Sequence, residues 1–323
     1  MSLRKKFFVV FAGMMFFAST LIPLVGAQNN QAAGNGLQIS PTRTDISASP
    51  GEVKPFTVTI KNITDIKLTL RATLNDFESD NVTGNPQIIV DDRRTPYTLE
   101  KMLTGLENIE IEPDGTKTVK LALDIPGNTP AGAYFGAIRF QAVPNSNNES
   151  ERQIALNASV AHLVFLDIPG EVVEQVQVEE VNIQRAIDGN VSSGSFFFQP
   201  PNQSSLKIKN LGNGFSRPFG RITVNYNGNE VYGYDLNNKE PRGIILPNST
   251  RVFDDEIKNV TKPGKYTVVA SVTYGSGGEV ANYSKTFWYL PFWFLAIVAV
   301  VIILLVAGGY WGYKKYVAKR FSK

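Results

Sequence analysis

Few residues in this chain have side chains that commonly catalyse reactions or bind metals. His162 is the only histidine, and cysteine is absent. A histidine-based triad, a zinc thiolate site or a thiol nucleophile needs residues that the chain does not have, and no P-loop or nucleophile elbow occurs. His162 sits in an alternating apolar run, which favours a half-buried strand residue over a catalytic one. We therefore expect a non-enzymatic protein without a cofactor.

Catalysis would have to use carboxylates. Asp76, Glu78 and Asp80 follow one another at a spacing of two, so in a strand they would share one face. Such a set can bind Ca²⁺ or act as the acid pair of a hydrolase. Asn81 and Gly84 follow directly, which favours a solvated loop instead.

A second charged stretch in the same region mixes both signs. Asp91, Asp92, Arg93 and Arg94 form either an exposed loop whose charges compensate one another or a surface that faces a partner. With Tyr97 they are our first candidates for partner binding. The acidic run 254–256 is interpreted as a solvated strand end.

Three consecutive aromatic residues, Phe196, Phe197 and Phe198, stand out in the second half of the chain. Successive side chains of a strand point to opposite faces, so all three rings cannot enter one sheet core. One or two of them should lie between domains or face a ligand. A contact between domains is the favoured interpretation, and the three residues are also candidates for partner binding.

Strands must position these residues, because apolar and polar residues alternate along most of the chain. Alternation and turn residues predict strands over 39–47, 56–60, 67–74, 108–112, 118–125, 133–143 and 154–168. The segment 76–110 is less regular, with a short helix expected over 99–106. Excursions of this length are often functional, so 76–110 is the candidate binding insert.

The second half of the chain repeats phrases of the first half. The phrase 58–63 (VTIKNI) has its echo at 206–211 (LKIKNL), and 130–134 (PAGAY) has its echo at 262–266 (KPGKY). A third echo links 111–116 to 246–250, and the three occur in the same order in both halves. Short strands with Gly, Pro and Asn turns indicate antiparallel sandwiches. The predicted fold class is all-β, with two tandem immunoglobulin-like β-sandwiches at 37–170 and 171–288.

Both ends of the chain indicate export and a membrane anchor. Basic residues at 4–6 precede the apolar run 7–25 and a small-residue exit, which predicts a signal peptide at 1–27 and a flexible leader at 28–36. An uncleaved N-terminal anchor is the alternative. The uncharged run 292–310 has nineteen residues, close to the roughly 20 that cross a bilayer as a helix. We expect one transmembrane helix at 289–313.

The charges around this helix predict its orientation. Five basic residues and no acidic ones follow it, so the tail 314–323 should be cytoplasmic and the sandwiches outside. The net charge of +3 is close to the sum of the two basic ends, which leaves a near-neutral exterior part without a surface for nucleic acid. The residues expected at the membrane interface are Trp288, Tyr289, Trp293, Tyr310, Trp311, Lys314 and Lys315.

The combination of a signal peptide, a Pro-Gly turn, an I-K-N strand, an E-P-D-G turn, the phrase PAGAYFGAI at 130–138, a second sandwich and a basic-tailed helix resembles the WxL-interacting proteins of bacterial cell surfaces. The resemblance spans about 37–323, and within 196–279 it holds in outline. It implies a first domain that binds peptidoglycan and a second that binds WxL-domain surface proteins. The W-x-L tripeptides at 288–290 and 293–295 are explained instead by the collection of Trp at membrane interfaces.

These patterns favour a membrane-anchored surface adaptor that binds a cell-wall polymer, another surface protein, or both. One alternative is a carbohydrate-active or proteolytic surface enzyme that uses the carboxylates at 76, 78 and 80. Another is a subunit of an envelope assembly, because an immunoglobulin-like domain with an open edge can lend or accept a strand.

Overall fold

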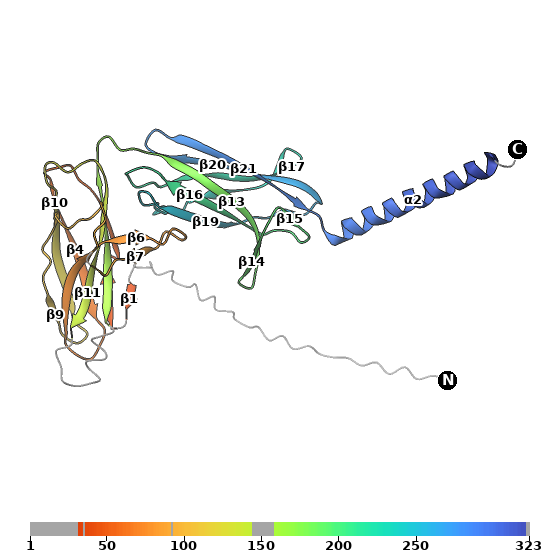
Figure 1. Ribbon diagram of the computed structural model, residues 1–323. Helices are drawn as coiled ribbons and strands as arrows, with labels where there is room; N and C mark the ends of the chain where they lie inside the picture. Colours follow the sequence, from red (N-terminus) through yellow and green to blue (C-terminus); the bar gives the residue numbers. More distant parts are fainter. Residues whose placement is uncertain (1–31, 35, 92, 144–157, 321–323) are drawn as a thin grey trace, which may run out of the picture.

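The computed structural model describes residues 32–34, 36–91, 93–143 and 158–320, which are mostly β-strand with one long C-terminal helix (Figure 1). The expected all-β class is confirmed for these residues. The expected signal peptide and residues 28–31 of the expected leader lie outside them, as does the first part of the strand expected at 154–168.

Two sheets face each other in the N-terminal half, which we call the N-terminal sandwich. One has the order β1 (Ala32–Gly34), β2 (Leu37–Ser40), β4 (Val53–Asn62), β10 (Thr116–Asp124) and β8 (Leu103–Thr104). The other has the order β3 (Arg43–Ser47), β12 (Ser159–Ile168), β11 (Gly132–Val143), β5 (Leu68–Asn75) and β9 (Ile109–Ile111). Alternate residues of these strands build one core that includes Leu37, Val58, Leu70, Ile138 and Leu166.

The strand expected over 39–47 is in fact two strands in different sheets. β2 pairs antiparallel with β4, whereas β3 pairs parallel with β12 on the other sheet. Pro41 stands between them and has no N–H to donate to a ladder, so pairing stops there and the chain crosses to the second sheet. Periodicity cannot reveal this crossing, since both halves alternate normally.

The C-terminal half, which we call the C-terminal sandwich, also contains two large sheets. One has the order β14 (Asn190–Ser193), β13 (Val176–Ile187), β16 (Gln203–Asn210) and β19 (Thr250–Glu256). The other has the order β15 (Phe196–Phe197), β21 (Glu279–Tyr289), β20 (Gly264–Tyr274), β17 (Phe219–Tyr226) and β18 (Asn229–Leu236). Its own core contains Ile183, Ile208, Val224, Val268 and Phe287.

The repeated I-K-N phrase ends in a buried asparagine that does the same work in both sandwiches. Asn62 donates from Nδ2 to the carbonyls of Ile66 and Ile111, at 2.7 and 3.3 Å. Asn210 donates from Nδ2 to Gly214 and Ile245, at 2.8 and 3.0 Å. Each side chain therefore ties the end of its strand to a neighbouring loop, where unpaired carbonyls would otherwise be buried at a cost.

The second repeated phrase ends in a tyrosine that bonds back to the chain. The hydroxyl of Tyr134 donates to the carbonyl of Pro130 at 3.1 Å, and that of Tyr266 donates to Lys262 at 2.9 Å. A tyrosine whose hydroxyl bonds to the backbone a few residues upstream is a hallmark of immunoglobulin-like sandwiches. The echo in the sequence therefore has a structural cause.

The two sandwiches lie at a large angle to one another, and a small sheet of β6 (Phe77–Ser79) and β7 (Pro86–Ile88) lies in the inner corner between them (Figure 1). The helix α2 (Phe292–Arg320) leaves the far end of the C-terminal sandwich. Its segment Phe292–Val317 is long and apolar enough to cross a membrane. The helix also continues beyond residue 313 into the basic tail, further than the sequence predicted.

Candidate partner-binding site

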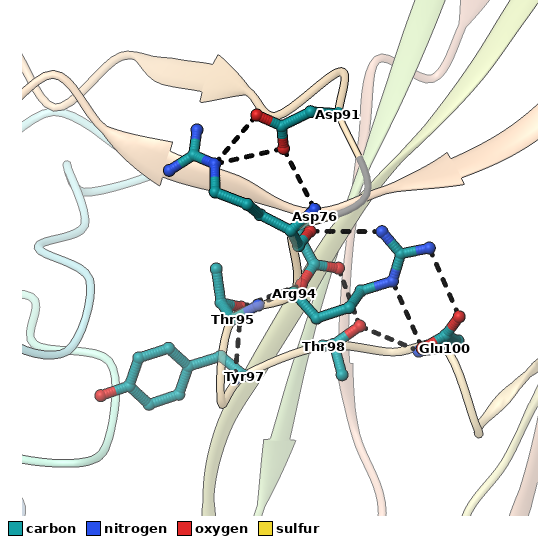
Figure 2. Close-up of polar contacts among 8 residues, drawn as sticks. Asp76, Asp91, Arg94, Thr95, Tyr97, Thr98 and Glu100 are labelled. Atoms are coloured by element: carbon teal, nitrogen blue, oxygen red, sulfur yellow. Dashed lines mark hydrogen bonds and ion pairs between the residues drawn. The ribbon is translucent and has the colours of Figure 1, made fainter.

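The segment 76–110 is built around one buried carboxylate. Asp76, only 1% exposed, accepts hydrogen bonds from the Thr95 amide at 2.6 Å, the Thr95 hydroxyl at 3.2 Å and the Thr98 hydroxyl at 2.7 Å (Figure 2). Asn75 adds a bond from Nδ2 to the carbonyl of Ile89 at 3.0 Å. These bonds hold the irregular loop against the N-terminal sandwich. Asp76 is thus a structural anchor with its oxygens occupied.

The short helix expected over 99–106 is not formed. Met102 and Leu103 both donate their amides to the carbonyl of Leu99, which makes a single turn, and the chain then pairs with β10 as β8. The fully buried Leu99 side chain belongs to the core of the N-terminal sandwich. Burial of this one leucine and the pairing with β10 leave no room for a second helical turn.

The loop between β6 and β7, residues 80–85, is called the hairpin tip. Asp80 accepts hydrogen bonds from the amides of Val82 and Gly84 and from the hydroxyl of Thr83, and the Thr83 bond is the main cause that lowers its pKa. Gly84 has a φ of +78°, and a Cβ there would lie 2.8 Å from the Cδ of Arg251. The carboxylate of Asp80 therefore holds the turn of the tip together. This agrees with the interpretation of the stretch as a loop.

The hairpin tip binds the edge of the C-terminal sandwich. The amide of Val252 donates to the carbonyl of Val82 at 2.7 Å, and the amide of Thr250 donates to Oδ1 of Asn81 at 3.1 Å. The tip thus covers the outer edge of the first half of β19 through one backbone bond and one side-chain bond. The candidate insert is consequently a clamp between the two sandwiches.

An apolar cluster completes this contact, which we call the junction. Phe135 of β11 stacks on Tyr97 at 5.4 Å and lies 6.0 Å from Phe215, and Phe215 also makes an edge contact with Phe165 at 5.5 Å between ring centres. Asn248 donates from Nδ2 to the Tyr97 hydroxyl at 2.8 Å. Aromatic pairs and apolar burial therefore join the sandwiches, and the candidate residue Tyr97 is part of that joint.

A hollow of about 230 Å³ opens beside the junction. Its lining comes from both sandwiches and combines rings with amide and carboxylate groups, among them Phe77, Tyr97, Glu78, Asn81 and Asn248. Glu78 is the one member of the acidic set 76, 78 and 80 that remains exposed. The hollow is smaller than the roughly 300–1,000 Å³ of most small-molecule sites, but it combines apolar and polar groups as such sites do.

The charged residues of the loop that follows β7 form ion pairs with one another and with Glu100. Arg93 contacts Asp91 through Nε at 3.0 Å, and Arg94 contacts Glu100 through Nε at 3.3 Å. Hydrogen bonds from Arg93 lower the pKa of Asp91. Asp92 lies outside the described residues. A self-compensating loop was one of the two interpretations of this stretch, and its partner-facing role stays a prediction.

The aromatic run 196–198 lies at the opposite end of the C-terminal sandwich from the junction, so the expected contact between domains is wrong. Phe197 is buried in the C-terminal core, where its ring contacts Phe287 edge-on at 5.8 Å. It is therefore unavailable to a partner. Phe196 is 63% exposed and Phe198 47% exposed, and Phe198 stacks on Phe292 of α2 at 5.0 Å.

The residues expected at the membrane interface lie in three places: in the core of the C-terminal sandwich, around the start of α2, and further along α2. Tyr289 is 8% exposed and belongs to the core of the C-terminal sandwich, so its ring packs against protein, and its place at the interface stays a prediction. Trp288 and Trp293 are exposed on either side of the start of α2. The residues placed along α2 itself are Tyr310, Trp311, Lys314 and Lys315, and Lys315 lies 5.1 Å above the Trp311 ring.

His162 is fully buried in β12, as a strand residue should be. Its Nδ1 lies 2.8 Å from the carbonyl oxygen of Pro41, while its Nε2 is buried without a hydrogen-bond partner among the described residues. Burial lowers its pKa. The ring stacks on Phe56 at 5.9 Å and belongs to the packing of the N-terminal sandwich.

A second surface, which the sequence did not reveal, lies where β18 and β19 end the two C-terminal sheets. We call the outer edges of these strands and the space between them the seam. Among the described residues no strand pairs with the outer side of β18. A hollow of about 260 Å³ lies here, lined by residues that include Asp235, Lys239, Phe253, Asp254 and Asp255.

The contact with the hairpin tip shows which backbone amides of β19 point to its outer edge. The amides of Thr250 and Val252 point to the outer edge, because both bond to the tip. Amides on one edge recur every second residue, so those of Asp254 and Glu256 point to the same side. They have no backbone partner in the described part of the chain.

The seam carries several carboxylates, and some of its ionisable side chains are partly buried. Burial raises the pKa of Asp255, and the neighbouring carboxylate of Asp254 raises it further. Burial also raises the pKa of Tyr234, whose hydroxyl lies 2.6 Å from Oγ of Ser204. The sequence showed the acidic run 254–256 but not the second strand, β18, that faces it.

No protein-family model and no curated protein matches the chain. Among solved structures, the class 5 fimbrial chaperone CfaA is 14% identical, with 79% of this chain and 99% of that chain covered and a TM-score of 0.38. The CupB2 chaperone of Pseudomonas aeruginosa is 12% identical, with 77% and 99% covered and a TM-score of 0.33. Similarity at this level concerns the fold alone and carries nothing about ligands.

Proposed function

We propose that this chain is a non-enzymatic envelope protein that binds an extended segment of a protein partner along the seam. Two immunoglobulin-like domains, 37–170 and 171–288, stand outside the membrane, and α2 anchors them with the basic tail in the cytoplasm. The observation that carries the proposal is the open half of β19. The hairpin tip covers its first half with two hydrogen bonds, and beyond the tip the outward amides of β19 have no backbone partner among the described residues.

Strand addition fits this edge for a physical reason. Proteins usually protect sheet edges by shortening the outer strand or covering it. Of the other outer strands, β1, β8, β9 and β15 have two or three residues each, β14 has four and β3 has five. In contrast, β18 has eight residues, of which the carbonyl of Val231 is covered by a bond from Asn259. An extended segment would satisfy the remaining edge groups through main-chain hydrogen bonds.

The charge of the seam selects among such segments. Asp235, Asp254 and Asp255 line the hollow, whereas Lys239 and Arg251 bring fewer positive charges. Complementarity therefore favours a segment that carries Lys or Arg at alternate positions, since like charges across an edge are repelled. The resemblance noted in the sequence makes a WxL-domain surface protein our proposed partner class.

Site-specific photo-cross-linking in cells tests the proposal. A benzophenone amino acid at position 239, inside the seam, should give one discrete adduct with a protein, and the same group at position 117 on the N-terminal sandwich should not. Asp254→Pro, which removes the outward N–H, should abolish the adduct, whereas Asp254→Ala should retain it. Equal adducts from both positions, or from both variants, would refute strand addition.

Binding of a wall polymer at the junction hollow is the second candidate, favoured by its mixture of rings and amides. Insoluble wall polymer should retain the full-length chain in detergent, and Asn248→Leu should release it while Asn229→Leu should not. Point variants are needed here, because deletion of 76–110 would remove the clamp and part of the apolar cluster as well. Retention of both variants alike would exclude the hollow as the polymer site.

The positions of the three carboxylates support a non-enzymatic role over the enzymatic alternative. Of the three carboxylates, Asp76 is buried beneath two threonines and Asp80 is held by the backbone of its own turn. Neither faces Glu78 as the second member of a hydrolytic pair. A non-enzymatic role is accordingly part of our proposal.

A further inference from the structure

Exposed aromatic side chains gather where the C-terminal sandwich meets α2. Phe196 of β15 lies opposite Trp288 of β21, which in turn lies opposite Lys265 of β20. Residues opposite one another on neighbouring strands point to the same face, so the three form a row. The outward-facing row combines two exposed rings with one exposed cation.

Only residues 289–291 separate Trp288 of this row from α2, and hydrogen bonds join this stretch to the run 195–198. The amides of Trp288 and Leu290 donate to the carbonyls of Ser195 and Phe197, each at 2.8 Å. Pro291 is buried, and α2 begins at the next residue. The run 195–198 is thus hydrogen-bonded to the stretch that leads directly into the helix.

The depth of these rings follows from the helix. The ring of Phe198 stacks on that of Phe292, the first residue of α2, with the ring centres 5.0 Å apart and the planes 12° apart. If α2 spans a bilayer, its first residues lie where the acyl chains meet the headgroups. Phe198 must then lie at that level too, with Trp293 on the helix beside it.

We propose that Phe196, Phe198 and Trp288 insert into the outer interfacial layer of the membrane and form a second lipid contact beside α2. This inference rests on the proposed membrane anchor. Aromatic rings collect at this layer because one part of the group is apolar and the other tolerates water. Lys265 at the end of the row faces the headgroups, where anionic lipids attract it. The C-terminal sandwich therefore rests on the membrane with the seam held at a fixed distance from it.

The absence of cysteine allows a direct test with single labels on the full-length chain. An environment-sensitive fluorophore is attached to Phe196→Cys, to Ile303→Cys within α2, or to Val280→Cys, an exposed site toward the other end of β21. Each protein is placed in phosphatidylcholine/phosphatidylglycerol nanodiscs with or without lipids brominated in the upper acyl chain. Interfacial side chains reach about 5–10 Å into the boundary, so the brominated lipids should quench the emission at 196 and leave that at 280 unchanged.

The three positions distinguish the possible outcomes. Quenching at 303 and 196 but not at 280 is the expected result. Quenching at 303 alone would overturn the lipid contact while leaving the anchor intact, and would leave the aromatic row to a protein. No quenching at 303 would overturn the anchor and this inference together. Lys265→Glu should weaken quenching at 196 in the mixed lipid but not in phosphatidylcholine alone.

Discussion

The junction makes the clearest quantitative prediction, because one ring of the C-terminal sandwich, that of Phe215, contacts two rings of the N-terminal sandwich. Phe215 contacts Phe135 and Phe165, both on the N-terminal side, at 6.0 and 5.5 Å. Each aromatic pair contributes about 0.5–1.5 kcal/mol beyond burial, so Phe215→Ala should weaken the junction by about 2 kcal/mol. That free energy corresponds to about a 30-fold increase in the fraction of molecules whose sandwiches have separated.

Hydrogen exchange measures this fraction even when it is small. The amide of Val252 bonds to Val82 across the junction at 2.7 Å, and the amide of Ala133 bonds to Asn213 across it at 3.0 Å. Both amides exchange when the junction opens, so both should lose protection by about 30-fold in the variant. The amide of Leu206, in the central strand β16, should keep its protection.

A matched variant separates junction opening from general loss of stability. Phe56 packs on the core of the N-terminal sandwich and stacks on His162, away from the junction. Phe56→Ala should destabilise that sandwich without a selective loss of protection at Val252. The reasoning is refuted if Phe215→Ala folds and leaves the protection of Val252 and Ala133 unchanged.

Three further predictions concern buried polar groups. Asp76→Ala should lower the free energy of unfolding by about 3 kcal/mol in urea, because three hydrogen-bond donors lose a charged acceptor; unchanged stability would contradict the anchor. Burial lowers the pKa of His162 in the folded state, so stability should fall as the pH drops below the unfolded value of 6.5, and His162→Gln should flatten that slope. Burial and Asp254 raise the pKa of Asp255, so its ionised form opposes folding at neutral pH. Asp255→Asn should therefore raise the melting temperature at pH 7, with a gain that shrinks as the pH falls through the folded pKa.

Local patterns predicted most of the strands. The expected strand at 56–60 is found within β4, 67–74 corresponds to β5, and 118–125 to β10. These agree because a sheet with one face in a core requires alternation, and alternation is visible in sequence. The sequence did not show that 39–47 is divided between two sheets, because this depends on which strands pair with each half. It also did not show that 99–106 forms no helix, because this depends on the pairing of 103–104 with β10.

The candidate residues show the same division. The sequence singled out 76–110 as a candidate binding insert, which stays a prediction, and in the structure Tyr97 within it contacts Asn248 of the other sandwich. It could not show that the hairpin tip binds β19, since these segments are about 170 residues apart and carry no shared pattern. The sequence indicated that the three rings of the run 196–198 could not all enter one sheet core. Only the packing showed that Phe197 is buried while Phe196 and Phe198 are exposed.

The sequence by itself determined the mostly-β class, the apolar C-terminal helix and the repeated phrases whose asparagines and tyrosines close loops in both halves. Each of these depends on neighbours within a few residues or on a period along one strand. The tertiary structure alone decided the clamp, the junction, the seam and the position of Phe198 beside α2. These features arise where distant segments meet, and their contacts follow from how whole sheets pack against each other.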